Sequence, residues 1–317
     1  MTDNIDKYNK GNATVKNGAD DQKSDKTDNL ENNIEDNERK MVDVIIPTYR
    51  PAKEFGELLH RLEKQEYRPN RILVMNTGKE YWNSEWENYP LLEVHHLDQK
   101  DFDHGGTRKR AAELSTSDIM VFMTQDALPA DRKMIGNLVR AVSRNSGTGA
   151  AYARQLPKAD CRFLERYTRS FNYPEQSSVK SLPDVETYGI KTYFCSNVCA
   201  AYDREIYQKI GGFVNRAIFN EDMIYAAGVI QAGYAIAYAA DAKVIHSHNY
   251  SGWQQFTRNF DLGVSHVQYP AVFDGVPPEG EGMKLVKKTA VYLAKTAPWL
   301  LPKLIWQSGM KWLGYRF

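Results

Sequence analysis

A run of apolar residues that ends on a carboxylate is the first feature of this sequence that could do chemistry. The stretch VFMTQDALPAD (121–131) starts like a core strand and turns polar at Asp126, and Pro129 then blocks further strand pairing. Asp126 could cap the turn that follows through its own side chain. It could instead bind a hard cation, because Mg²⁺ and Mn²⁺ are commonly held by one or two carboxylates together with substrate phosphate oxygens. We favour the cation site, with the turn cap as its alternative.

A second acidic site follows in FNEDMIYA (219–226). Glu221 and Asp222 open a predicted helix behind Asn220, a residue type that is common at helix N-caps. Acids in a first turn interact favourably with the helix dipole, by less than about 1 kcal/mol. One of them could instead be a general base that takes a proton from an incoming hydroxyl. The residue types alone leave both roles open.

Histidine and arginine side chains supply further candidates. His246 and His248 alternate along VIHSHNY, so they share one face of a strand. Two imidazoles at this spacing can bind a metal, although a single histidine with satisfied hydrogen bonds is commoner. Arg258 follows on a predicted helix, and arginine suits bidentate contact with a diphosphate. In DHGGTRKR (103–110), two glycines precede Arg108; this could be a phosphate-binding turn, or equally a solvated basic turn.

The elements that must position these residues form an alternating pattern. Short apolar runs at 42–46, 71–75, 92–98 and 119–123 indicate strands, the first of them ended by Pro47. Residues 52–65 have helical spacing, and GGTRKRAAELSTSD (105–118) suggests a Gly-rich turn followed by a helix. This order predicts an α/β fold with a mixed, mostly parallel central sheet flanked by helices. Ligands of such sheets bind beyond the carboxyl ends of the strands. The residues selected by this rule are Thr48, Tyr49, Arg50, Asn76, Thr77, Gly78, Thr124, Gln125 and Asp126.

The alternation loosens beyond about residue 150. Residues 192–213 suggest a strand, a short helix and a Gly-Gly turn, and AIAYAADAKVIHSH (235–248) suggests a strand, a turn and a second strand. Cys161, Cys195 and Cys199 are an odd number, without a second pair that would complete a zinc site. We therefore expect buried small side chains and a reducing, cytoplasmic environment.

Charge is unevenly distributed along the 317 residues, although the formal net charge is only +1. Residues 1–40 carry ten acids, seven bases and a single aromatic residue, so we predict a disordered acidic and polar segment. They lack the apolar region of a secretory signal. Residues 41–282 are net negative, at −3, which argues against nucleic acid as a partner. No apolar run reaches the roughly 18 residues of a spanning helix.

The last residues are basic and aromatic. Residues 283–317 carry seven bases and no acid, and Trp299, Trp306 and Trp312 recur at near-heptad spacing. These residues could form a helix that packs on the preceding α/β domain. They could also form an interfacial helix, with aromatics in the headgroup layer and lysines against anionic lipid. Pro298 and Pro302 should divide the segment into shorter helices.

Taken in order, several motifs resemble the family-2 inverting glycosyltransferases of the GT-A fold, over roughly residues 41–265. They are DVIIPTYRP, FMTQDALP where that family has its Asp-x-Asp metal motif, GGF followed by NEDMIYA, and QFTRN in place of Gln-x-x-Arg-Trp. The set DFDHGGTR, TQDA, FCSN and HSHNY is most similar to bacterial rhamnosyltransferases of cell-wall and capsule assembly, which use dTDP-rhamnose. The resemblance implies a catalytic domain at 41–270, with a nucleotide-binding half (41–130) and an acceptor half (131–270). A basic, aromatic, amphipathic C-terminal extension would occupy 271–317.

The resemblance also implies a role for each candidate residue. Asp222 would be the catalytic base, with Glu221 orienting it or contacting the acceptor. A divalent metal, Mg²⁺ or Mn²⁺, would be bound by Asp126, and His246 or His248 would complete the metal or diphosphate site. Arg258 would neutralise the leaving group. The remaining donor-binding residues would be Thr48, Tyr49, Arg50, Asn76, Arg108 and Gln125. Two positions depart from the pattern: the first Asp of Asp-x-Asp is Thr124, and Asn76-Thr77 replaces the usual Asp pair.

The predicted reaction is transfer of a sugar, best rhamnose, onto a hydroxyl of a cell-surface polysaccharide or a lipid-linked oligosaccharide. The enzyme would lie in the cytoplasm, peripherally at the inner face of the plasma membrane. A sugar nucleotidyltransferase is one alternative, but PTYRP has no glycine for the Gly-rich first loop that such an enzyme needs. A carbohydrate-binding module without catalysis is the other.

Overall fold

Continuous apolar runs build a parallel half-sheet at the start of the chain. The computed structural model describes residues 39–276 and 279–317, so the disorder predicted for residues 1–40 falls almost wholly outside the described residues. In this half, β1 (Val42–Tyr49) pairs in parallel with β2 (Arg71–Thr77) and β4 (Ile119–Met123), and β2 pairs in parallel with β3 (Leu92–Leu97). Strand residues such as Ile45 are fully buried, as expected of strands covered on both faces.

The second half of the sheet is mixed. Over the described residues nine strands follow the order β3-β2-β1-β4-β8-β6-β9-β5, with β7 also paired to β9. Of these, β8 is antiparallel to β4 and to β6, β6 is parallel to β9, and β5 and β7 are antiparallel to β9. The sheet is therefore mixed, as expected, with parallel pairing throughout the first half and between β6 and β9 in the second. The strands of this half are β5 (Leu128–Pro129), β6 (Thr148–Leu156), β7 (Ser178–Lys180), β8 (Cys199–Asp203) and β9 (Ala235–Ile245).

The direction of β8 positions the site. Because β8 runs against β4, the residues that follow β4 lie beside the residues that precede β8, and the Thr124 amide donates to the Val198 carbonyl at 3.2 Å. The segments 124–126 and 196–198 therefore meet at one edge of the sheet.

The turn expected inside residues 235–248 is wrong. β9 is one strand, and its register with β6 shifts so that Ala153 pairs with Ala239 but Arg154 pairs with Lys243. The extra residues of β9 form a bulge, with Asp241 exposed. The polar residues that suggested a turn thus sit in an irregularity of a continuous strand.

Helices cover the sheet and extend the chain past it. They are α2 (Glu54–Glu63), α3 (His104–Leu114), α4 (Met134–Ser143), α5 (Phe163–Asn172), α6 (Val185–Tyr188), α7 (Arg204–Ile210), α8 (Glu221–Gln231), α9 (Gly252–Gln268), α10 (Pro270–Phe273), α11 (Glu279–Thr296) and α12 (Leu301–Arg316). Residues Met41–Phe317 form one unit by their contacts. Cys161, Cys195 and Cys199 are free and buried, as expected.

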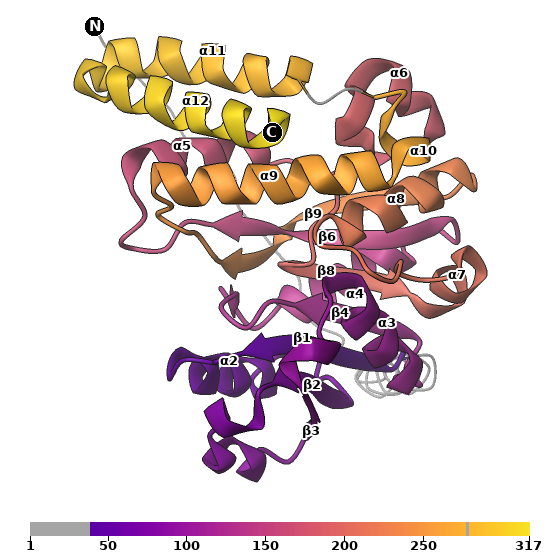
Figure 1. Ribbon diagram of the computed structural model, residues 1–317. Coiled ribbons are helices and arrows are strands. Elements are labelled where there is room, and N and C mark those ends of the chain that lie inside the picture. Colours follow the sequence, from indigo (N-terminus) through magenta and orange to yellow (C-terminus); the bar gives the residue numbers. More distant parts are fainter. Residues whose placement is uncertain (1–38, 277–278) are drawn as a thin grey trace, which may run out of the picture. The chain divides into compact units, whose positions relative to one another are not determined.

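The last two helices pack on the body of this unit. Figure 1 shows α9 between the sheet and α12, with α11 beyond. The fit of α12 on α9 is close: a Cβ at Gly314 would lie 2.2 Å from the Phe256 carbonyl oxygen, and one at Gly263 would lie 2.8 Å from the Tyr315 carbonyl oxygen. Pro298 and Pro302 open the 3₁₀ turn Pro298–Leu300 and α12, so the predicted division of this segment is confirmed. None of the helices described has the length and apolarity needed to cross a membrane.

Candidate active site

Asp126, His246 and His248 converge at the ends of β4 and β9. The Asp126 Oδ2 atom lies 3.1 Å from His248 Nε2 and 3.4 Å from His246 Nε2, and the two Nε2 atoms are 3.0 Å apart. Within the described part of the chain, this is the only group of three or more such side chains arranged to hold a metal ion. The structure thus brings together all three residues that the sequence analysis assigned to a metal; we call them the cation cluster.

Gln155 fixes the orientation of His246. The side-chain oxygen of Gln155, Oε1, accepts a hydrogen bond from the guanidinium of Arg169, and a guanidinium can only donate. The same oxygen lies 3.0 Å from His246 Nδ1, so Nδ1 must carry the proton. Burial lowers the pKa of His246, although Asp126 opposes that effect. A neutral His246 therefore turns the lone pair of Nε2 towards Asp126.

This donor set fits a divalent cation. Burial by itself would raise the pKa of Asp126, but the hydrogen bonds that His246 and His248 donate when their Nε2 atoms carry a proton outweigh it and hold the pKa below its ordinary value. When His246 is neutral, its Nε2 lone pair faces the Asp126 carboxylate instead, which is unfavourable unless a positive charge lies between them. A ligating histidine typically donates its other ring N–H to a fixed acceptor, as His246 does to Gln155. The group can therefore hold a metal with these three side chains.

The acidic pair lies at the start of α8, and the two acids differ. Glu221 is buried, its Oε1 atom accepts from Asn197 Nδ2 at 2.9 Å, and it lies 3.2 Å from the Arg108 guanidinium. Asp222 is partly exposed, and its Oδ2 atom accepts from the backbone N–H of Asn197 at 2.9 Å. Glu221 is thus committed to Arg108, whereas Asp222 can reach a ligand.

Burial raises the pKa of Asp222 to about 7, and the neighbouring charge of Glu221 adds to the effect. The two carboxylates form an interacting pair, so this value belongs to the pair as it titrates. A carboxylate with a pKa near neutrality is well matched to accept a proton near pH 7. The local chemistry therefore favours a base at Asp222.

Hydrogen bonds connect the acidic pair to the cation cluster. Gln155 accepts from His246 and also donates to Ser196 Oγ at 3.1 Å. The next residue, Asn197, holds Asp222 through its backbone and Glu221 through its side chain. Tyr202 fixes Asn197 in turn, by donating to its Oδ1 at 2.7 Å. Residues 196–197 therefore connect the two groups: Ser196 contacts Gln155, which holds His246, and Asn197 contacts both acids.

Arg258 contacts the surroundings of both groups from α9. Its guanidinium carbon lies 4.9 Å from the ring centre of Phe219, just before the acidic pair, and 5.0 Å from that of Tyr250. Tyr250 stacks on His248, with ring centres 5.0 Å apart. Arg258 itself is exposed. A cation held by two aromatic faces can still meet an anion on its open side.

Tyr49 and Arg50 form an exposed cluster with Tyr81 at the end of β1. Arg50 has φ of +47°, donates to the Tyr81 hydroxyl at 2.7 Å and lies 4.3 Å over the Tyr81 ring. The Tyr49 and Tyr81 rings meet edge to face, with centres 6.1 Å apart. The positive φ, which is strained for a residue other than glycine, turns the arginine onto this aromatic surface.

Asn76 and Arg108 were expected to contact the nucleotide directly, but their side chains are buried and support other residues instead. The Asn76 side chain is completely buried, where it accepts from the Thr48 hydroxyl at 2.9 Å and contacts His96 Nδ1 at 3.0 Å. Arg108 is buried against Glu221. Both side chains have their described partners inside the protein, because these positions lie one layer below the surface of the site.

Two further positions also have supporting contacts. Thr48 is buried beside Asn76. The Gln125 amide accepts from the backbone N–H of Tyr49 at 2.9 Å and donates to its carbonyl at 3.0 Å. Gln125 thus extends the pairing of β1 beyond the end of β4 and fixes the backbone of Tyr49.

Two helix starts also differ from expectation. Asn220 precedes α8 in a left-handed conformation, with φ of +64°, and its side chain does not cap the helix. Gly105 and Gly106 lie inside the first turn of α3, where both N–H groups donate to Asp103 Oδ1 at 3.0 Å. A Cβ at Gly105 would come within 1.9 Å of the Val214 carbonyl oxygen. These glycines therefore serve a close helix contact, and the predicted Gly-rich turn before the helix is absent.

Several residues of the site were missed from the sequence. Gln155 follows the pattern of a polar side chain near the carboxyl end of a strand, and Asn197 lies in the motif FCSN, so a signal existed for both. Tyr81, Phe219 and Tyr250 contribute through aromatic contacts with arginines. No spacing rule indicates such contacts, because they join segments that are distant in the sequence.

Comparison with known proteins decides the class. Residues 43–211 match the family model described as glycosyl transferase family 2. The chain belongs to this family. It is therefore a glycosyltransferase, and the predicted family is confirmed.

Two curated relatives cover most of the chain. The O-antigen chain rhamnosyltransferase RfbN of Salmonella typhimurium is 40% identical, over 87% of this chain and 88% of the relative. The O-antigen chain rhamnosyltransferase WbaN of Salmonella anatum is 36% identical, over 86% and 87%.

Solved structures share the GT-A-like fold. The mannosyltransferase PcManGT from Pyrobaculum calidifontis, in complex with GDP-Man and Mn²⁺, has a TM-score of 0.56 at 19% identity and covers 85% of this chain and 74% of its own. The S. aureus protein TarS, residues 1–349, has a TM-score of 0.54 at 13% identity, covering 87% and 89%. At these identities the likeness concerns the fold.

Proposed function

We propose that the protein is an inverting rhamnosyltransferase that transfers rhamnose from dTDP-rhamnose to a hydroxyl group of a lipid-linked saccharide used in cell-surface polysaccharide synthesis. Two relatives named as O-antigen chain rhamnosyltransferases, at 40% and 36% identity, support the sugar. The observation that carries the chemistry is the hydrogen-bonded connection from Asp222 through Asn197, Ser196 and Gln155 to His246. It ties a base and a cation cluster to one sheet edge.

The chain's own residues account for the bond changes. Asp222 accepts the proton of the acceptor hydroxyl while the oxygen of that hydroxyl attacks the anomeric carbon of the donor. The bond from that carbon to the diphosphate oxygen breaks, and the electron pair leaves with the diphosphate. Attack from the opposite face inverts the configuration. Glu221 stays with Arg108 and raises the pKa of Asp222 by its charge, and Arg258 offers its exposed face to the leaving diphosphate.

A divalent metal would be held by Asp126, His246 and His248. When bound, it supplies a positive charge that stabilises a developing diphosphate. Mg²⁺ and Mn²⁺ are both candidates, but imidazole nitrogens suit transition metals better than Mg²⁺, which prefers oxygen ligands. We therefore favour Mn²⁺. Tyr49, Arg50 and Tyr81 would receive the nucleotide, with Thr48, Asn76 and Gln125 supporting them from below.

A panel of activated sugars tests this function. Purified protein is incubated with a synthetic lipid-linked saccharide acceptor and one of dTDP-rhamnose, UDP-glucose, UDP-GlcNAc or GDP-mannose, with Mn²⁺ or with EDTA. We expect product from dTDP-rhamnose with Mn²⁺, and the opposite anomeric configuration by NMR. Equal transfer from GDP-mannose would contradict the assigned donor, and retained configuration would contradict the mechanism.

The same panel separates the alternatives. A nucleotidyltransferase would form nucleotide sugar from dTTP and a sugar phosphate, and it would release pyrophosphate. A carbohydrate-binding module would not bind dTDP at all, with or without Mn²⁺. Calorimetric titration with dTDP therefore completes the experiment.

We further propose that the enzyme acts at an anionic membrane surface through its C-terminal helices. Large apolar side chains with high exposure gather on α9, the 3₁₀ turn and α12. They include Trp253 (68%), Trp299 (74%), Ile305 (73%), Trp306 (62%) and Trp312 (58%), together with Phe317 (84%) just after α12. Residues 283–317 add seven bases and no acid. Aromatics at headgroup depth and lysines near anionic lipid, each contributing about 1 kcal/mol, favour such binding.

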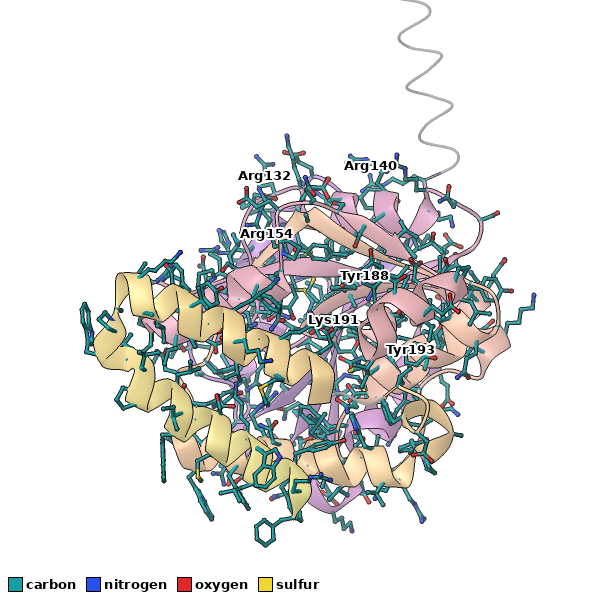
Figure 2. All side chains as sticks on the ribbon, turned by 90° about the horizontal axis from the view of Figure 1, so that it is seen from above. Arg132, Arg140, Arg154, Tyr188, Lys191 and Tyr193 are labelled. Atoms are coloured by element: carbon teal, nitrogen blue, oxygen red, sulfur yellow. The ribbon has the colours of Figure 1, made fainter. Side chains whose placement is uncertain are left out.

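Liposome flotation tests the membrane proposal. Deleting α11 and α12 would uncover the faces of α5 and α9 that they cover, so a surface variant is a cleaner probe. We expect Trp299→Ser with Trp306→Ser to lose binding to phosphatidylglycerol vesicles. The matched control is Tyr188→Ser, a half-exposed aromatic of α6 (Figure 2). Equal flotation of the double variant and the control would sink this proposal.

A further inference from the structure

A cavity of about 690 Å³ lies between α5, α9, α11 and α12. Its size is within the range of small-molecule sites, about 300–1,000 Å³. Much of the wall is aliphatic, including Leu164, Leu262, Met283 and Val286. α11 is held over this region at its start, where Lys191 pairs with Glu281 at 2.7 Å, and Figure 2 shows Lys191 near that end of the helix. The apolar wall calls for a ligand with a hydrocarbon portion.

The charged side chains of the wall are mainly cationic. Among the lining residues whose side chains the structure describes, Arg162, Lys303 and Lys311 are cationic and Glu165 is the one acid. That acid is already paired with Arg169 at 2.9 Å. Burial lowers the pKa of Lys311, and Glu165 offsets part of this effect. Cations on an apolar wall match a ligand that carries an anionic group on a hydrocarbon chain.

The cavity adjoins the transfer site. His248 and Tyr250 belong to its lining. His248 is also a member of the cation cluster, 3.1 Å from Asp126, and Tyr250 carries Arg258 on its ring. Arg258 is an electrostatic neighbour of Lys311 as well. A molecule in the cavity would therefore have one end beside the reacting groups.

The cavity also reaches the exposed apolar surface of α12. Ile305 and Trp312 line it while remaining 73% and 58% exposed. Both belong to the exposed apolar side chains of α12 described above. A hydrocarbon chain can thus pass from this surface to the transfer site along one wall.

We propose that this cavity binds the phosphate-linked hydrocarbon chain of the lipid that carries the acceptor saccharide, with Lys311 facing its phosphate. The proposal rests on the proposed function, because it assumes a lipid-linked acceptor. Bilayer phospholipid is the other source of such chemistry. The carrier lipid is favoured because the cavity leads to His248, and only the acceptor molecule must reach the reacting groups.

Two glycines offer a fold-neutral way to block the cavity. Gly282 on α11 and Gly309 on α12 both line it, and a Cβ at either position meets no atom within 4 Å. Replacing glycine in a helix does not weaken the helix itself. Gly280 is the matched control: it lies one half-turn away on α11, also has open space, and does not line the cavity.

Calorimetry with farnesyl phosphate tests binding directly. EDTA is present, so that the phosphate cannot bind through a cation. We expect Gly282→Phe and Gly309→Leu to weaken binding about ten-fold or more, since each displaced methylene contributes roughly a factor of four. Gly280→Phe should bind like the parent protein. Lys311→Met should weaken farnesyl phosphate but not farnesol.

Each other result overturns the proposal. Equal binding by Gly282→Phe and Gly280→Phe would place the probe elsewhere, and equal binding of farnesol and farnesyl phosphate would remove the phosphate site. Dihexanoyl phosphatidylglycerol that competes as well as farnesyl phosphate would make the cavity a bilayer-lipid site.

Kinetics keep this failure distinct from failure of the proposed function. In Gly282→Phe we expect a raised KM for the lipid-linked acceptor with unchanged hydrolysis of dTDP-rhamnose in its absence. An enzyme that transfers rhamnose normally in all the glycine variants retains its function and loses only this cavity assignment. A parent protein without any transfer loses the function itself, even where farnesyl phosphate binds as expected.

Discussion

Two aspartates at one edge of the sheet have opposite electrostatic surroundings. Asp126 faces two imidazoles, and its pKa lies below the ordinary value despite burial. Asp222 is partly buried beside Glu221, and its pKa rises to about 7. Near neutral pH, Asp126 therefore stays ionised, whereas Asp222 can gain and lose a proton.

The difference between the two pKa values arises from the neighbouring side chains and not from the secondary structure that carries each aspartate. Asp126 follows a strand and Asp222 opens a helix, but each is an acid in a partly buried position. What separates them is whether the next charged or polarisable group is a histidine or a carboxylate. A division of roles between two carboxylates by their environments is a general way in which enzymes run base chemistry near neutral pH. The predictions below attack this division of roles, one member at a time.

Removing the base should have the largest effect. We expect Asp222→Asn to lower kcat by about 10²–10⁴-fold, the usual contribution of a general base, while dTDP binding is unchanged. Rates are measured with dTDP-rhamnose, and binding by calorimetry. Asp241→Asn is the control, because that exposed aspartate lies in the bulge of β9, where it pairs with Arg140 at 3.9 Å. Full activity in Asp222→Asn would assign the base to another residue.

Removing the carboxylate of the cation cluster should chiefly abolish metal binding. Calorimetric titration with Mn²⁺ alone should show binding to the parent protein, weaker binding of Mg²⁺, and none to Asp126→Asn at the same concentrations. Asp131→Asn serves as the control in the same loop, because its side-chain oxygen can still accept from the Lys133 N–H. Equal Mn²⁺ affinity in the parent protein and Asp126→Asn would leave Asp126 with only its turn-capping role.

Changing the support of His246 should have a smaller effect on the same quantity. Gln155→Met removes the acceptor for His246 Nδ1 and should weaken Mn²⁺ binding about 10–100-fold, as loss of an outer partner typically does. Gln155→Glu keeps an acceptor and should retain binding. Thermal unfolding of both variants checks the fold, since Gln155 also contacts Arg169 and Ser196. If both variants bind Mn²⁺ like the parent, the tautomer of His246 is not set by residue 155.

The sequence predicts the polar residues at the ends of the strands better than the buried residues beneath them. Buried runs such as VDVIIPTY and IMVFM identify their strands, and the polar residue at the end of a run points to the site, as Asp126 does. Whether such a residue faces a ligand or the core depends on packing, so Asn76 and Arg108 were assigned one layer too far out. Gln155 joins the two halves of the site across 91 residues to His246, a pairing that only the fold creates.

Neutralising Glu221 should have the smallest effect and the most specific one. Glu221→Gln keeps the shape and an oxygen for Asn197 Nδ2 and Arg108, but it removes the negative charge that helps to raise the pKa of Asp222. Transfer requires deprotonated Asp222, so activity of the parent enzyme should rise with pH through about 7. Without the charge of Glu221 the proton leaves more easily, and the rise should move to lower pH. The kcat/KM profile measures this, with Glu175→Gln on the surface as control. An unmoved profile would mean that the charge of Glu221 does not set the pKa of Asp222. A profile moved to higher pH would mean that Glu221 chiefly holds Arg108 in place, where the positive charge of Arg108 lowers the pKa of Asp222.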